Sequence, residues 1–231
     1  MNRTICAALV AAGLAIVGIM LPMAAKVFRS YERTVTVRGF DEREVPADKA
    51  IWPVVYKVVG DDLDVVNREI ASKKNFIVKF LEDGGISASD ISFGVPAISD
   101  KYASEYGDNN RLYRYVATCT ITVCSNDVEK VVALMNDQSK LLDHGIVSTN
   151  DWNTQPQFLF EGLNDIKPEM VAAATKSARL AGEQFAKDSG SKLGKIRSAS
   201  QGSFSIEDRD SNTPQMKKVR VVTTIVYYLS R

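Results

Sequence analysis

The sequence predicts an α+β fold in which a mixed or antiparallel sheet carries helices on one face, preceded by an N-terminal transmembrane helix. The chain begins with a long uncharged stretch, and segments rich in β-branched residues then alternate with helical apolar stripes. A helix-strand-strand unit occurs twice, because Phe80-x-x-Asp83-x-Gly85 and Phe185-x-x-Asp188-x-Gly190 match near the ends of two long helices. We therefore expect an anchor at 1–26, a linker at 27–33 and one folded domain at 34–231.

The composition is that of an ordinary folded protein. Of 231 residues, 45% are apolar and 25% are charged, which excludes disordered and collagen-like classes. The 29 basic and 28 acidic residues nearly cancel, so the folded part lacks the basic excess that captures nucleic acid or anionic lipid. A single histidine and three cysteines exclude most histidine-based catalytic and metal sites.

The N-terminal stretch from Ile5 to Ala25 is long enough to cross a bilayer as a helix. A cleaved signal peptide is the alternative, but bulky Met23 occupies a position that should be small if cleavage followed Ala25. A retained anchor is favoured. Its predicted membrane-contacting residues are Ile5, Leu9, Leu14, Ile16, Ile19 and Leu21.

The charges around this stretch leave the topology open. Lys26, Arg29 and Arg33 outnumber Arg3, so the positive-inside rule would keep the folded domain in the cytoplasm. The short, signal-like N-terminus favours export instead, and we give it more weight. The expectation is a single-pass inner-membrane protein with its domain in the periplasm, or a cleaved form soluble in the periplasm.

The first half of the domain is expected to form two strands, a helix and a hairpin. Strands are predicted at Thr34–Arg38 and Ala50–Val59, with a turn region from Gly39 to Pro46 between them. Pro53 indicates that the second strand lies partly at an edge or has a bulge. The helix follows caps at Asp61 and Asp62, ends at Gly84-Gly85, and carries an apolar stripe of Leu63, Val66, Ile70, Ile77, Phe80 and Leu81. Ile91–Ile98 and Leu112–Cys124 are expected to pair.

The second half repeats this pattern. A shorter helix is predicted over Val128–Leu142, with Val131, Leu134, Met135 and Leu142 inward, followed by an extended segment at Ile146–Phe160. A third helix is expected to start near Pro168. Its predicted inner side consists of Met170, Ala174, Ala178, Ala181 and Phe185. Lys195–Ser205 and Val219–Leu229 form the final hairpin.

Residues that could carry chemistry have simpler structural interpretations. Cys119 and Cys124 lie an odd number of positions apart in one strand, so they face opposite sides and are expected to be small buried thiols. His144 lies at a helix end, where it can satisfy carbonyls. Asp208–Asn212 resembles the front of a calcium loop, but it lacks the glycine and the final acid and fits a polar hairpin tip better. No catalytic, cofactor-binding or metal-binding residue is predicted.

A tyrosine- and arginine-bearing loop is a candidate contact region for a partner. Its members are Tyr102, Tyr106, Arg111 and Tyr113. Such residues can stack bases, but the glycine-containing signature of RNA-binding strands is absent and cross-strand aromatic pairs are common, so nucleic acid is not expected. Lys217, Lys218 and Arg220 could face lipid or a neighbouring subunit, or protect a strand edge.

The order of several short motifs resembles the SIMPL-domain family over nearly all of residues 34–229. The motifs are Val35–Gly39, Val45–Ala50, Gly84-Gly85-Ile86 and Lys192–Ile196; Asp41 and Ala47 depart from the family pattern. The segment Asn164–Pro168 resembles the membrane-anchored branch found in Gram-negative bacteria. This resemblance implies a periplasmic, immunogenic protein associated with oxidative stress, which assembles into large ring-like homo-oligomers and has no established catalytic activity.

These observations predict a membrane-anchored structural or scaffold protein of the cell envelope that associates with itself through sheet edges and is not an enzyme. One alternative is an envelope module that binds a ligand or partner through the loop from Tyr102 to Tyr115. The less favoured alternative is an enzyme that uses carboxylates or tyrosines with a cofactor.

Overall fold

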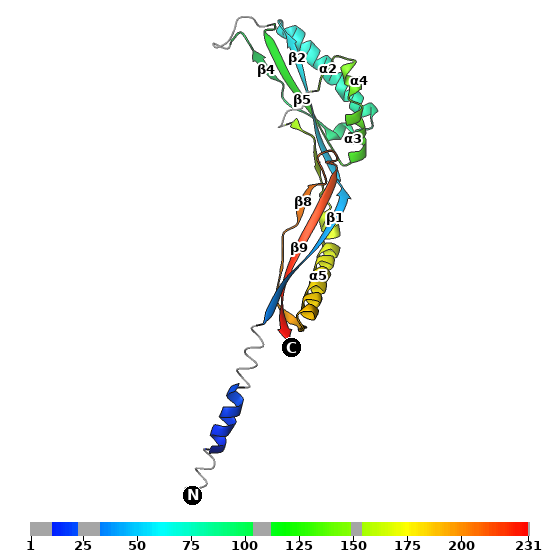
Figure 1. Ribbon diagram of the computed structural model, residues 1–231. Helices are drawn as coiled ribbons and strands as arrows, with labels where there is room; N and C mark the ends of the chain where they lie inside the picture. The colour runs from blue at the N-terminus through cyan, green and yellow to red at the C-terminus, as the bar shows by residue number, and fades with distance from the viewer. Residues whose placement is uncertain (1–10, 23–32, 104–111, 149–153, 231) are drawn as a thin grey trace. The chain divides into compact units, whose positions relative to one another are not determined.

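The computed structural model describes residues 11–22, 33–103, 112–148 and 154–230 (Figure 1). The chain divides into two compact units. Unit 1 contains the described residues of Met1–Arg43, Asn164–Ile206 and Lys218–Arg231, and unit 2 contains those of Glu44–Leu163 and Glu207–Lys217. We describe each unit by itself; the boundaries expected at residues 26 and 33 stay a prediction.

The strands form two antiparallel sheets, so the single sheet expected from the sequence is wrong. Sheet A has the order β1-β9-β7, with β8 also paired to β9; sheet B has the order β3-β5-β2-β6, with β4 also paired to β5. Alternation of strands and helices along a chain does not say how many sheets the strands build. The bounds in sheet A are β1 Thr34–Pro46, β7 Lys192–Gln201, β8 Ser205–Asp208 and β9 Met216–Ser230. Those in sheet B are β2 Lys49–Gly60, β3 Ile91–Phe93, β4 Ala97–Asp100, β5 Tyr115–Ser125 and β6 Gln157–Leu159.

Helix α2 (Leu63–Asp83) covers one face of sheet B in unit 2 (Figure 1). The Asp62 side chain accepts hydrogen bonds from the Asp64 and Val65 amides, and Gly85 takes a positive φ at the other end, so the predicted helix limits are confirmed. The helix buries Val66, Ile70, Ile77 and Leu81, whereas Leu63 is exposed. Beneath the helices, sheet B contributes its buried residues Ala50, Trp52, Val54, Tyr56 and Val58.

The pairings around β2 and β5 agree with the expected hairpin and explain Pro53. Strands β3 and β4 both pair antiparallel with β5, and the short helix η1 (Ala88–Asp90) precedes them. β2 pairs with β5 continuously from Ala50 to Gly60, without a bulge. Its pairing with β6 stops at Ile51, two residues before Pro53. Proline therefore lies where β2 becomes an edge on that side, as the sequence indicated.

The helix expected over Val128–Leu142 is two helices, α3 (Val128–Asn136) and α4 (Ser139–Leu142). The chain restarts after Asp137, whose amide still bonds back to Ala133 and Leu134. This restart changes the inward face, so Leu141 is buried and Leu142, which was predicted inward, is exposed.

Unit 1 packs helix α5 (Leu163–Asp188) closely against β1 (Figure 1). A Cβ on Gly39 would lie 2.1 Å from the Ala178 nitrogen and 2.2 Å from the Ala174 carbonyl oxygen. Gly39 is thus a contact point within a strand and not part of a turn, which corrects the expectation. The helix starts before Pro168 and buries a row spaced by four: Met170, Ala174, Ala178, Gly182 and Ala186. Ala181 and Phe185, which were predicted inward, are exposed.

The predicted transmembrane helix is wrong. Residues 11–22 form a helix, and within the described parts of the chain no helix is long and apolar enough to cross a membrane. A crossing needs about 20 apolar residues. Four of the predicted membrane-contacting residues lie in this helix with exposed side chains: Leu14, Ile16, Ile19 and Leu21. The other two, Ile5 and Leu9, lie outside the described residues.

Candidate functional site

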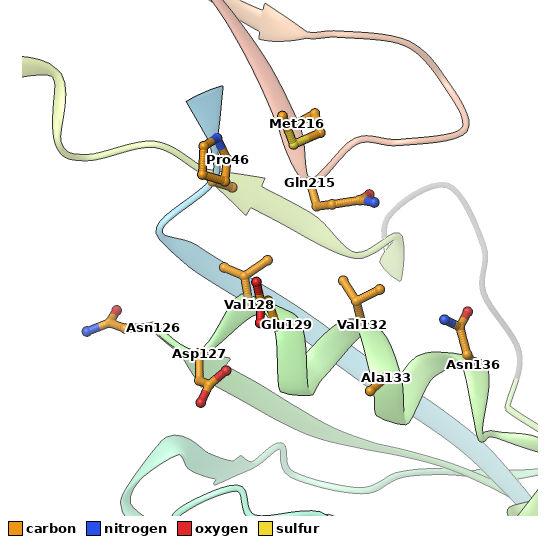
Figure 2. Close-up of a pocket in the computed structure, with 11 residues that line it drawn as sticks. Pro46, Asn126, Asp127, Val128, Glu129, Val132, Ala133, Asn136, Gln215 and Met216 are labelled. Carbon is orange, nitrogen blue, oxygen red and sulfur yellow. The ribbon is translucent and has the colours of Figure 1, made fainter. Parts of the chain in front are cut away.

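A surface groove of about 870 Å³ in unit 2 follows helix α3. Figure 2 shows Val128 and Val132 on the side of α3 that faces Gln215 and Met216, with Glu129 beside Val128 at the start of the helix. The end of β1 and the connection to β2 complete the lining with Pro46 and Ala47. A hydrogen bond of 2.8 Å from the Ala47 nitrogen to the Gln215 oxygen joins these two chain segments. The groove is therefore built on backbone held by secondary structure.

The groove has an apolar floor and a polar rim. The buried Val128 and half-buried Val132 and Met216 form apolar surface, while Asn126 and Asn136 lie toward opposite ends of α3 (Figure 2). Both acidic lining residues, Asp127 and Glu129, lie at the start of the helix, and no basic residue joins them in the described lining. The groove therefore carries net negative charge.

The two carboxylates differ in whether a basic group of the protein already pairs with them. Asp127 caps α3 through the Lys130 amide and pairs with the Lys130 ammonium group at 2.7 Å. These hydrogen bonds, the side-chain bond first, lower the pKa of Asp127. Glu129 is exposed and has no ion pair or side-chain hydrogen bond within the described residues. Glu129 is thus the carboxylate left for a ligand.

A second hollow of about 720 Å³ lies directly beside the first. The two share Val132, Asn136 and Gln215 as lining residues. The second adds apolar surface from Pro156 and Pro214. Together they form an elongated depression with Glu129 in the first part and mainly apolar and amide groups where the two parts meet.

His144 lies elsewhere, on a third hollow in unit 2. Its amide bonds to the Leu141 oxygen at the end of α4, and its ring stacks on Phe76 with centroids 3.7 Å apart. The same hollow is lined by Lys140 and Asp137, which pair with each other at 2.9 Å. His144 thus follows a helix end, as expected, but in the described chain its ring packs on Phe76 and does not bond to a carbonyl.

The two cysteines in β5 face opposite sides, as predicted, but only Cys119 is buried. Burial raises the pKa of the Cys119 thiol and so disfavours its thiolate. Cys124 is exposed, opposite Ile51 of β2, which corrects the expectation that both are buried. Cys124 is therefore the thiol that reagents can reach.

The segment Asp208–Asn212 forms a polar connection between β8 and β9. The Asp210 carboxylate accepts hydrogen bonds from the Asn212 and Thr213 amides, each 2.8 Å long. Asp208 pairs with Lys217. These carboxylates therefore bind the protein's own donors, and no acidic or histidine cluster in the described chain could hold a metal ion.

The tyrosine-bearing loop is described only at its two ends. Tyr102 and Tyr113 are exposed there, and Tyr106 and Arg111 lie outside the described residues. An ion pair of 3.0 Å between Arg114 and Asp100 joins the ends, and the hydrogen bond from Arg114 lowers the pKa of Asp100. A role in partner contact stays a prediction.

The basic residues near the start of β9 are already paired. Lys217 pairs with Asp208 in unit 2. In unit 1, Lys218 and Arg220 both approach Glu42, at 2.9 and 3.7 Å. Arg220 also lies over the Phe40 ring. The patch is thus largely neutralised, which leaves little positive charge for lipid.

Sequence reasoning missed the groove because its residues come from three separate segments. The sequence contained one signal of the groove. The buried stripe of α3 consists of Val128, Val131 and Leu134, and Val132 is an apolar residue outside that stripe. An apolar helical residue outside the core stripe indicates a second apolar surface.

The described residues form a mixed α/β fold with two antiparallel sheets, each packed against a long helix, and comparison assigns its family. The SIMPL family model, described as "Protein of unknown function (DUF541)", matches residues 35–227. The chain belongs to the SIMPL family, as its motif order indicated. No curated protein matches the chain.

Proposed function

We propose that this protein is a non-enzymatic scaffold of the cell envelope that associates with itself through one face of sheet B. The observation that carries the proposal is the composition of that face. Helices cover the other side of β2 and β5, and the residues alternating with the core point away from them. We call this surface the outer face; its β2 and β5 residues are Lys49, Ile51, Pro53, Val55, Lys57, Val59, Val116, Thr118, Thr120, Thr122 and Cys124.

The outer face has little charge and a regular shape. Its charged residues on these two strands are Lys57 and, at the start of β2, Lys49, which pairs with Glu161 at 2.8 Å. The threonines of β5 stand opposite Pro53, Val55 and Lys57. Most of these side chains are exposed or half-buried. An ordered sheet surface with few charges is typical of interfaces, because burying it removes apolar area from water and desolvates few ions.

A face is better suited to this contact than the strand edges of sheet A. β7 pairs with β9 on one side, but two register irregularities interrupt that pairing. It also carries Lys192, Lys195 and Arg197, and bulges and basic residues protect edges from added strands. Two copies joined by the same face close into a pair, so the ring-like assembly implied by the resemblance requires a further contact.

An envelope location fits this proposal, since the uncharged N-terminal stretch after Arg3 has the pattern of an export signal. Val65→Cys places a thiol on α2 outside the outer face, and in a chain that also carries Cys6→Ser and Cys124→Ser it should be labelled by a membrane-impermeant maleimide once the outer membrane of the cells has been opened. Protection of this cysteine until the inner membrane is lysed would contradict this location. The link to oxidative-stress defence stays a prediction.

Sedimentation velocity of the full chain tests the self-association. We expect species heavier than the monomer at micromolar concentration, and Val59→Lys should shift them toward the monomer by placing a second charge beside Lys57. Val65→Lys is the matched control, because Val65 is also exposed but lies on helix α2. Equal sedimentation of both variants and the unchanged chain would reject the outer face as the contact.

A further inference from the structure

The groove along α3 has a free carboxylate at one end and apolar side chains further along, and the proposed scaffold function does not use this arrangement. One of its carboxylates, Asp127, is bound by Lys130 and the helix amides, while Glu129 has no partner in the described chain. Beyond Glu129 the lining becomes apolar, with Val132 and Met216, and then amide-bearing, with Asn136 and Gln215. A complementary ligand has a cationic head followed by an apolar body.

The continuity of the two hollows favours a chain-like body over a compact one. The first hollow measures about 870 Å³ and the second about 720 Å³, and each falls in the range of small-molecule sites. Their shared residues, Val132, Asn136 and Gln215, make a continuous path between them. In the second hollow Pro156 and Pro214 add apolar surface, and the polar residues Gln155, Asp208, Ser211 and Asn212 also line it.

The backbone of the groove favours such a ligand over an extended peptide. Peptides that add to a sheet use free main-chain groups. Here the Ala47 nitrogen already donates to the Gln215 oxygen. The Asp127 carboxylate is likewise occupied as the cap of α3. Recognition therefore depends on Glu129, the rim amides and the apolar floor.

We propose that the groove along α3 is a binding site for a cationic single-chain amphiphile, whose positive head pairs with Glu129 and whose apolar chain lies over Val132. The head group gains an ion pair with Glu129, and the chain removes the apolar floor from water. The same site would not accept an anionic amphiphile of equal length, because Glu129 repels its head.

Isothermal titration calorimetry of the full chain tests this proposal with two probes below their micelle concentrations. Decyltrimethylammonium should bind with one site per chain, and decyl sulfate should not bind at this site. Glu129→Gln should weaken binding of the cation up to about fivefold, the loss expected for one exposed ion pair. Raising the salt concentration should weaken binding in the unchanged chain more than in the variant.

Two further variants distinguish the groove from general adsorption. Glu82→Gln removes an exposed carboxylate on α2 outside the groove and should leave the affinity unchanged. Val132→Trp should fill the groove and abolish binding, with circular dichroism confirming that the variant folds. The proposal is overturned if both probes bind equally, if Glu129→Gln has no effect, or if a Lys-containing apolar peptide binds and decyltrimethylammonium does not.

Discussion

At the residue scale, the polar side chains of the described chain mostly serve its own backbone. Asp62 and Asp127 cap helices, and Asp210 closes the β8–β9 connection. Asp48 accepts hydrogen bonds from the Glu161 and Gly162 amides and so fixes the chain after β6. Glu129 differs, because it lies in a groove without such a partner. This contrast distinguishes it from the structural carboxylates.

Asp210 provides a test of this local bonding. The Thr213 hydroxyl, and then Arg209, lower the pKa of Asp210 to about 2 by hydrogen bonding to its carboxylate. Since the folded-state pKa is depressed, the contribution to stability is present above the unfolded-state value and is lost as the pH falls toward 2. Carboxyl ¹³C NMR titration should find this low midpoint, and Thr213→Val should raise it. A midpoint near the ordinary value of 3.8 in the unchanged chain would contradict the described turn.

At the element scale, small residues determine how closely α5 approaches sheet A. The buried row of Ala174, Ala178 and Gly182 lets the helix lie directly on the strands, and Gly39 completes the contact from β1. The backbone atoms around Gly39 cannot move without displacing the whole helix. Around Gly182 the nearest atoms belong to the flexible end of Leu193.

Two matched substitutions compare these sites by chemical denaturation. Gly39→Ala should destabilise unit 1 by about 3 kcal/mol or more, because its Cβ would overlap backbone atoms of α5. Gly182→Ala should cost much less, since its contacts are 3.3 Å long and alanine favours the helix by about 1 kcal/mol. Equal effects of both changes would contradict the close packing.

The elements show which features the sequence could predict. Helix limits were predictable because caps are local: Gly85 and Gly190 both have positive φ, and the next amides bond back to Leu81 and Ala186 in the same way. The repeated Phe-x-x-Asp-x-Gly pattern therefore marks two equivalent helix ends. The inner face of α5 was not predictable, since an alanine-rich helix offers several similar stripes and packing against Gly39 selects one.

At the scale of the whole molecule, two sheets replace the single expected sheet because long-range pairing follows packing and not local propensity. The groove was missed for the same reason, as Pro46, Val132 and Gln215 are far apart in sequence. Family membership was predictable, because the order of short motifs can be recognised without knowing which strands pair. The outer face of sheet B follows only once the register of β2 with β5 is known.

The outer face carries an exposed cysteine, Cys124, which can be labelled to measure self-association. Cys124 is exposed on this face, and Cys119 is buried and protected from reagents. A nitroxide can therefore be placed on Cys124 in the full chain after Cys6→Ser. Pulsed electron-electron double resonance then measures the dipolar coupling between labels on different copies. We predict a resolved coupling that disappears when labelled chain is diluted with unlabelled chain, and that Val59→Lys abolishes. A featureless decay in the unchanged chain would contradict contact through the outer face.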